Sequence, residues 1–294
     1  MCTAVLSIEP GLPVLLAGIR DELTDRAWRR PWRHWPAYPG LIGGLDLQAG
    51  GTWLAVAPRE RRVSCVLNGR GAMAPPLARR SRGDLPLRSA AGEPLLRSRL
   101  TGFDPFHLLT AEPGRAVMQS WDGELVSERE LGPGLHIVVN SGLASDPSGD
   151  APPADARPAD APPADARPQA DLRESGRSAE PRTQAPNGRD HELARIAHFL
   201  PRFRTAKRPA PQPGEPVPQA WGAWLPLVDG DGIDQRDPRA LLVRRDLGDG
   251  RTWGTTSVSL VALSPGAVRY DFSGTPGDPA AWFAVPGVEA ASVG

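Results

Sequence analysis

The sequence predicts an α+β fold of short strands and a few helices, interrupted by a disordered insert. Glycine and proline contribute 32 and 34 of the 294 residues, and so many residues that break helices exclude a mostly helical protein. Most apolar segments alternate with a period of two residues, as strands do. Residues 145–189 contain Leu172 as their one large apolar residue, so this segment cannot bury enough surface to fold.

The expected strands lie on both sides of this insert. The first two are Thr3–Ile8 and Val14–Ile19, which form a hairpin across a short turn rich in proline and glycine. The other segments with strand-like alternation are Thr52–Val56, Arg62–Leu67, His107–Thr110, Val117–Trp121, Glu124–Arg129, Leu135–Asn140, Ala240–Val243, Ser257–Leu263 and Val268–Phe272.

Two helices are expected. Asp190–Leu200 has an aspartate that can cap its first turn, and Leu85–Leu100 is helical in pattern but interrupted by glycine and proline. The apolar residues that the first helix places on one face are Leu193, Ile196, Ala197 and Leu200.

The order of these elements predicts one domain rather than two. Residues 1–144 and 190–294 each contribute strands, and residues 145–189 form a disordered linker between them. The linker contains a tandem repeat, APPADARPAD followed by APPADARPQA, over residues 151–170. Such a composition is typical of a solvated spacer.

Charge and cysteine content exclude several functional classes. The 34 basic and 34 acidic residues balance, so no overall charge attracts nucleic acid. No apolar run is long enough to span a membrane, and the first ten residues lack a signal-peptide pattern, so we expect a cytoplasmic protein. Two cysteines and five histidines without zinc-like spacing predict no metal and no cofactor. Nothing indicates the oligomeric state.

The position of Cys2 in the sequence indicates a catalytic nucleophile. Aminopeptidases remove an initiator methionine that precedes a small residue, so the mature chain can begin with Cys2. A cysteine at the N-terminus carries a nucleophilic thiol and, in its α-amine, a base that can accept the thiol proton. If Met1 is retained, this mechanism is lost.

The expected first hairpin adds a second observation. If Ile8 pairs with Val14, Cys2 lies opposite Arg20, and Asp21 follows directly. Opposed side chains in a sheet have Cβ atoms about 4.5–5.5 Å apart, and a nearby cation stabilises a thiolate. The alternative is that Arg20 and Asp21 are the charged end of a strand.

These residues carry a resemblance to a known family. Cys2, Arg20-Asp21-Glu22 and the segments Gly43–Asp46 and Gly50–Leu54 resemble the NRDE family, which is typified by transport and Golgi organisation protein 2. Weaker matches are Ser81-Arg82-Gly83, Gly102-Phe103-Asp104, Asn140-Ser141 and Trp253-Gly254-Thr255-Thr256-Ser257. Ile19 stands where the family has asparagine, and Thr256 where it has arginine, for which Arg251 is a possible substitute.

The resemblance implies an Ntn-hydrolase-like fold, an αββα sandwich of two antiparallel sheets covered by helices. It also implies hydrolysis of a carbon–nitrogen amide bond by Cys2, with Arg20 and Asp21 in support. Asn68 and Asn140 end apolar strands and can donate hydrogen bonds to an oxyanion, although turn capping is an equal alternative. The ligand is then a small amide or acyl compound. The alternative function is a non-catalytic carrier of haem or acyl-CoA-type ligands.

Three further features of the sequence are candidate sites. Cys65 alternates with apolar neighbours and is expected to be a packed core residue. The segment Trp28–Trp35 (WRRPWRHW) can stack a flat ligand or bind an anion through its arginines. The glycine pairs at 43–44 and 50–51 are interpreted as turn residues around Asp46, not as a phosphate-binding loop.

Overall fold

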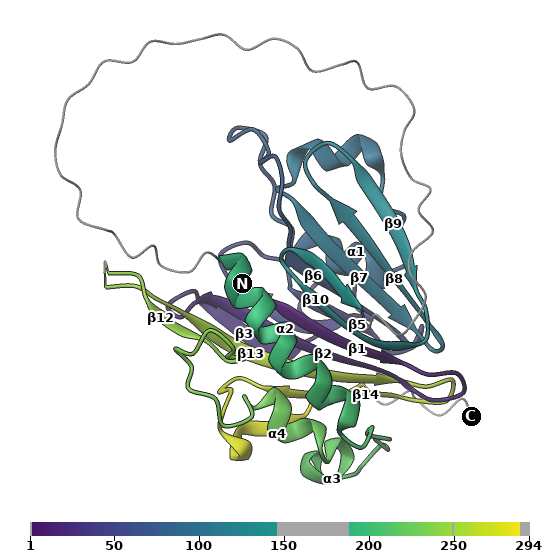
Figure 1. The fold of residues 1–294 in the computed structure, drawn as a ribbon. Helices are drawn as coiled ribbons and strands as arrows, with labels where there is room; N and C mark the ends of the chain where they lie inside the picture. Colours follow the sequence, from purple (N-terminus) through teal and green to yellow (C-terminus); the bar gives the residue numbers. More distant parts are fainter. Residues whose placement is uncertain (1, 146–187, 249, 289–294) are drawn as a thin grey trace, which may run out of the picture.

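The structure is a computed structural model that describes residues 2–145, 188–248 and 250–288 (Figure 1). The predicted linker at residues 145–189 lies outside these ranges except at its two ends, so its disorder stays a prediction. The described residues form two antiparallel sheets and a few helices.

The first sheet combines the N-terminal strands with strands that follow the insert. Within the described residues it has eight strands in the order β11-β10-β1-β2-β13-β14-β15, with β12 paired to β13. Their bounds are β1 Thr3–Ile8, β2 Val14–Leu23, β10 Gly134–Val139, β11 Gly142–Ser145, β12 Arg244–Asp246, β13 Thr252–Leu263, β14 Val268–Ser273 and β15 Trp282–Ala284. The long strand β13 joins the C-terminal part of the chain to β2.

The second sheet is a simple meander in which each strand pairs with the next along the chain. Its seven described strands follow the order β3 to β9. Their bounds are β3 Trp28–Trp32, β4 Ile42–Asp46, β5 Leu54–Ala57, β6 Arg62–Asn68, β7 Phe106–Glu112, β8 Arg115–Trp121 and β9 Val126–Leu131.

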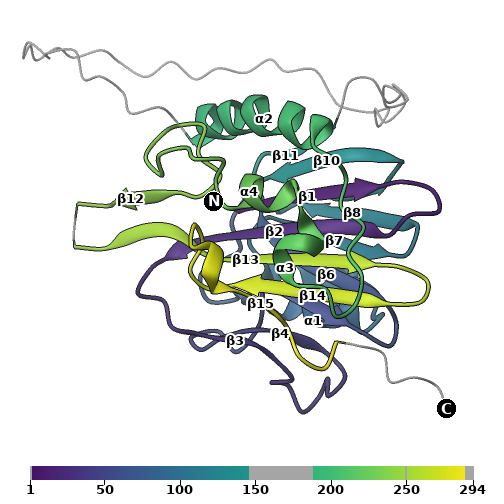
Figure 2. The same cartoon turned by 90° about the horizontal axis from the view of Figure 1, so that it is seen from below.

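The helices lie on different sheets. Those that pack with the first sheet are α2 Gly188–Thr205, α3 Val217–Trp221 and α4 Trp224–Val228, whereas α1 Asp84–Ala90 packs on β5 and β6. Two 3-10 helices, Arg97–Gly102 and Pro279–Ala281, complete the elements. Figure 2 shows α2, α3 and α4 in front of the first sheet, with the second sheet behind it.

The alternation within β1 explains how the first sheet is buried on both sides. Leu6 belongs to an apolar cluster that includes Val56 and Val63 of the second sheet. Val5 points the other way, into a cluster with Phe199 of α2 and Trp224 of α4. Because successive side chains of a strand point to opposite faces, one apolar strand contributes to both clusters.

Most of the expected strands are present, with ends shifted by a few residues. The segment Ala240–Val243 is the exception, because it is a buried loop rather than a strand. The expected helix Leu85–Leu100 is also wrong over most of its length. It ends at Ala90, since Gly92 adopts a positive φ of 82°, and only the 3-10 turn Arg97–Gly102 follows.

The second sheet contains two strands that were not expected. In β3, Pro31 interrupts the pairing between Arg29 and Trp32, which an edge strand tolerates. In β4, Gly43 and Gly44 are strand residues and not turn residues, so the turn interpretation of this pair is wrong. Gly50, with a φ of 72°, does lie in the expected turn.

The helix α2 begins near the expected residue, but its most buried side chains are not the expected ones. Its buried residues are His191, Glu192, Arg195, His198, Phe199 and Phe203. Leu193 is 55% exposed, so it is not part of the core. The face chosen from the apolar residues is therefore right in part, because Ile196 and Leu200 pack against the core whereas Leu193 and Ala197 are exposed, and the most buried face carries charge.

Gly44 gives a test of the packing between β4 and β5. A Cβ atom at this position would lie 2.2 Å from the Trp53 ring, so we expect Gly44→Ala to destabilise the fold by about 1–3 kcal/mol. The matched control is Gly40→Ala, because a Cβ there meets nothing within 4 Å. Urea unfolding of both variants measures the difference, and equal midpoints would contradict the packing described.

Candidate active site

A polar cavity of about 570 Å³ opens beside Cys2. Its walls come from the start of β1, the end of β2, the β4–β5 turn, β6 and the loop at residues 79–83. The lining residues include Cys2, Arg20, Asp21, Glu22, Arg26, Asp46, Trp53, Asn68, Arg79, Arg80, Arg82, Asp104 and Trp253. The cavity therefore contains the expected nucleophile and several charged groups.

The hairpin register agrees with the expectation for Cys2. Thr3 pairs with Ile19 at the end of the β1–β2 ladder. Continuing this register by one residue brings Cys2 opposite Arg20. The Cys2 backbone nitrogen lies 3.3 Å from Asn140 Oδ1, and its Sγ lies 3.8 Å from the carbonyl oxygen of Asp21. Half-buried Cys2 is thus held between β2 and the end of β10.

Arg20 is buried and makes several contacts. Its Nη1 donates to Thr256 Oγ1 at 2.7 Å, and its guanidinium lies over the Trp53 ring, 4.4 Å from the centroid. Glu22 and Asp46 each lie 3.7 Å from Nη2. Burial lowers the pKa of Arg20, and the negative charges of Glu22, a Cys2 thiolate and Asp46 oppose that effect.

Asp21 is buried from solvent and faces α2. Its Oδ1 accepts a 2.7 Å hydrogen bond from Thr255 Oγ1, and its Oδ2 lies 3.7 Å from Arg195 Nη1. Burial raises the pKa of this carboxyl group, and the Arg195 guanidinium acts in the opposite direction. Arg20 and Asp21 therefore have separate partners, although they are adjacent in sequence.

The two asparagines take different positions around Cys2. Asn68 ends β6 and lines the cavity together with Cys2. Asn140 follows β10 and contacts the Cys2 nitrogen, while its own carbonyl oxygen lies 3.3 Å from His107 Nε2. Burial lowers the pKa of His107, which favours a neutral ring that bridges Asn140 and Ser120.

Two charged residues of α2, which no sequence pattern singles out, contact residues of the site. Arg195 is 1% exposed, and its Nη1 donates to Thr3 Oγ1 at 2.6 Å in addition to its contact with Asp21. Buried Glu192 accepts a 3.1 Å hydrogen bond from the Ser141 backbone, directly after Asn140. Glu192, Arg195 and Phe199 share one face of α2 because of their helical spacing, but hydrophobic periodicity does not select the two charged residues.

Some of the other residues named from the sequence contact the site and some do not. Arg251 is exposed before β13 and is not among the lining residues, whereas Thr256 contacts Arg20 directly. Trp28 is partly buried and packs edge-to-face on Trp53 and Phe272 at the margin of the core. Within the ranges that the structure describes, no three His, Cys, Asp or Glu side chains are placed to hold a metal ion.

Cys65 and Cys2 differ in a way that alkylation can measure. Cys65 is buried in the cluster between the sheets, and burial raises its thiol pKa to about 12. Because a thiol reacts as its thiolate, Cys65 stays protonated and unreactive at pH 8, whereas Cys2 is open to the cavity. We expect iodoacetamide to label Cys2 much faster. Mass spectrometry of the two cysteine-containing peptides measures this, and equal rates would contradict the burial of Cys65.

Arg195 gives a second test. Arg195→Met leaves the buried Asp21 without its nearby cation, so we expect a loss of about 3–5 kcal/mol in unfolding free energy. The matched control is Arg202→Met on the same helix, where a half-exposed ion pair with Asp231 is worth less than about 1 kcal/mol. Chemical denaturation compares the two. Losses of equal size would show that the Arg195 contact adds nothing specific.

The comparisons with known proteins bear on the part of the chain that holds Cys2. A comparison with curated proteins gave no match. No helix in the described residues is both long enough and apolar enough to cross a membrane. The family model for Transport and Golgi organisation 2 matches residues 1–151, which include Cys2, Arg20, Asp21, Asn68 and Asn140. This match covers more than half of the 294 residues, and the chain belongs to the Transport and Golgi organisation 2 family.

Proposed function

We propose that this protein is an N-terminal-cysteine amidohydrolase, in which Cys2 attacks the carbonyl carbon of an amide after Met1 is removed. The observation that carries the proposal is the position of Cys2. Its nitrogen lies 3.3 Å from Asn140 Oδ1, and its thiol borders a cavity of about 570 Å³ that also contains Asn68. Nucleophile, base position and a hydrogen-bond donor thus meet in one accessible space.

We further infer that the two sheets form the αββα sandwich of the Ntn-hydrolase-like fold. One apolar cluster joins residues of both sheets, a second joins the first sheet to α2, α3 and α4, and α1 packs on the second sheet. These contacts support four layers in the order helix, sheet, sheet, helix. Family membership supports the same assignment.

In the first step of the proposed reaction, Cys2 Sγ forms a bond to the amide carbon and its proton passes to the α-amine. The tetrahedral intermediate then breaks its carbon–nitrogen bond, and the leaving amine takes the proton from the α-ammonium group. Asn140 Oδ1 accepts a hydrogen bond from the Cys2 α-nitrogen and so orients the base. In the second step, water attacks the thioester, which releases the acid and restores the thiol.

The remaining site residues stabilise the negative charges that form during the proposed reaction. The Asn68 side chain lines the cavity and can donate a hydrogen bond to the oxyanion, an interaction typically worth a few kcal/mol. Asp21 is tied to Thr255 and Arg195, and its backbone carbonyl contacts the thiol. Arg20 places a cation within electrostatic reach of the thiolate. We assign these two residues positioning and electrostatic roles.

Reversible carriage of an acyl ligand is the second candidate function. Thr256 stands where the family has an arginine, and the loss of that arginine counts against catalysis and so favours a carrier. The haem version of this alternative has less support. The histidine of the Trp28–Trp35 segment that could ligate haem is His34, which lies outside the cavity lining and whose Nε2 contacts the Arg30 carbonyl oxygen at 2.9 Å. The arginines of the Trp28–Trp35 segment are likewise absent from that lining. A cytoplasmic location remains part of the proposal.

A covalent adduct separates the two functions. Protein that begins with Cys2, verified by N-terminal mass spectrometry, should form a thioester with members of an amide and thioester panel. Cys2→Ser should slow this reaction strongly and Cys2→Ala should abolish it, because the step needs the side-chain nucleophile. Cys65→Ala is the control and should retain the adduct, since Cys65 is buried. Reversible binding that survives Cys2→Ala, without any adduct, would favour the carrier.

A further inference from the structure

The loop at residues 79–83, here called the arginine loop, forms one wall of the cavity and has a defined position. It carries Arg79, Arg80 and Arg82 in the sequence Arg-Arg-Ser-Arg-Gly. At its start, the Arg80 backbone nitrogen donates to the Gly102 carbonyl at 2.7 Å. At its end, the Thr52 nitrogen donates to the Gly83 carbonyl at 2.9 Å. The loop is therefore fixed at both ends on neighbouring segments.

Most of the charges around the cavity are paired with one another. Asp46 lies 2.7 Å from Arg26, and Asp104 lies 3.1 Å from Arg79. Arg20 lies near Glu22 and Asp46, as described above. These pairs occupy the carboxylates that line the cavity apart from Asp21, which faces Arg195.

Two arginines of the loop have no such carboxylate partner. Among residues 2–145, 188–248 and 250–288, no ion pair is formed by Arg80 or Arg82. Half-buried Arg82 donates from Nη1 to the Pro105 carbonyl at 2.8 Å, which leaves other donors of its guanidinium for the cavity. Burial lowers the pKa of Arg82, and Asp104, a Cys2 thiolate and Glu22 oppose that effect.

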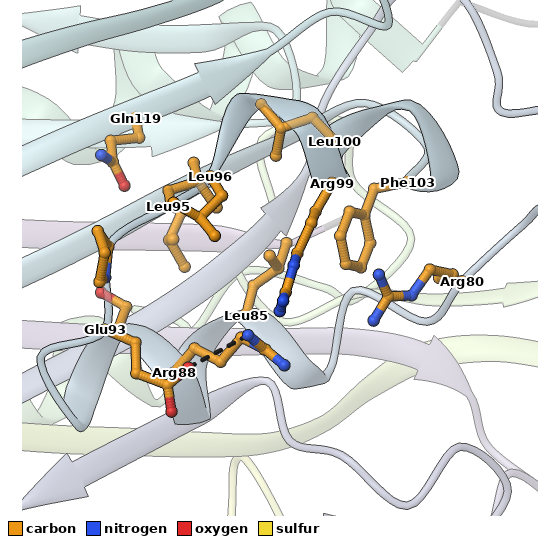
Figure 3. A pocket seen from close by; sticks show the side chains of 13 residues that line it. Arg80, Leu85, Arg88, Glu93, Leu95, Leu96, Arg99, Leu100, Phe103 and Gln119 are labelled. Carbon is orange, nitrogen blue, oxygen red and sulfur yellow. Dashed lines mark hydrogen bonds and ion pairs between the residues drawn. The ribbon is translucent and has the colours of Figure 1, made fainter.

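Arg80 extends the positive charge along the wall. Its guanidinium lies over the Phe103 ring, 5.0 Å from the centroid. Arg80 lines both the Cys2 cavity and a smaller pocket between α1 and the 3-10 helix Arg97–Gly102, which has both charged and apolar lining residues. Figure 3 shows Arg80 beside Phe103 at one end of this smaller pocket, with Leu85 and Leu100 nearby.

We propose that the arginine loop is an anion subsite of the Cys2 cavity, so that the substrate is an amide that also carries a carboxylate or phosphate group bound by Arg82 and Arg80. A partly buried cation without a counter-ion is costly, and an anionic ligand offsets that cost. The planar guanidinium matches both oxyanions with two parallel hydrogen bonds. This inference deepens the proposed function and rests on it for the amide.

Binding to a chain that cannot react tests the subsite separately from catalysis. In a Cys2→Ala chain, calorimetry compares a panel of N-acyl amino acids with their neutral carboxamides, and N-acyl phosphoethanolamines with the corresponding N-acyl ethanolamines. We expect the anionic member of at least one series to bind at least about tenfold more tightly, and Arg82→Gln to remove that preference. The series that shows the preference distinguishes carboxylate from phosphate.

Two further variants sharpen the comparison. Arg80→Gln should weaken the preference less than Arg82→Gln, because Arg80 is more exposed. Arg129→Gln on β9 is the matched control, since Arg129 is exposed and does not line the cavity, and it should leave the preference unchanged. Circular dichroism melting of each variant confirms that the fold is retained.

Equal affinity for anionic and neutral probes, or a preference that survives Arg82→Gln in a folded protein, would overturn the anion subsite. If the protein with an intact Cys2 then hydrolysed neutral amides, the amidohydrolase proposal would hold without an anion subsite. Conversely, an anion preference that depends on Arg82, with no thioester formed by any amide, would support the subsite and count against the hydrolase.

Discussion

The antiparallel pairing of β1 with β2 on one side and β10 on the other is the constraint on which the site depends. Thr3 pairs with Ile19 and with Val139, so Cys2 is carried to the point where Asp21 and Asn140 lie. A register shift of one residue would turn every side chain of β1 to the opposite face of the sheet. Because β1 is buried on both faces, such a shift would also misplace the apolar contacts on each side.

The same alternation separates the charges that follow on β2. Arg20 contacts Thr256, Trp53 and the acidic groups of the cavity, whereas Asp21 contacts Thr255 and α2. Because their side chains point to opposite faces of β2, Arg20 and Asp21 do not pair with each other. Arg20 is therefore a cation of the cavity wall, and the Asp21 carboxyl group faces α2. Each of these groups is buried, so each needs partners of its own.

Local patterns predicted the parts of this arrangement that depend on neighbouring residues. The β1–β2 register followed from alternation and a short turn, and Asn140 was selected because it ends an apolar strand. The role of α2 could not be predicted this way, since apolar residues were used to choose its buried face. Glu192 and Arg195 are buried because they meet Ser141 and Asp21, partners that are distant in sequence. Hydrophobic periodicity contains no information about such pairs.

The missed strands β3 and β4 have a related cause. Pro31 is tolerated because β3 is an edge strand with irregular pairing, and the sequence does not reveal which strand lies at an edge. At position 44 of β4 a glycine is required, because the Trp53 ring occupies the space that a side chain would take. In both cases the tertiary neighbour overrides a local preference. The roles assigned to Cys2, Asn68 and Asn140 remain predictions.

The site also draws on the chain at both sides of residues 146–187. The residues matched by the family model contain Cys2 and both asparagines, while the later part supplies Arg195, Thr255 and Thr256. Thr255 and Arg195 thus provide buried Asp21 with a hydroxyl donor and a cation, and both contacts favour its ionised form against the effect of burial. The surroundings of Asp21 therefore depend on residues from both described parts of the chain, whereas most of the other charges around the cavity come from residues 2–145.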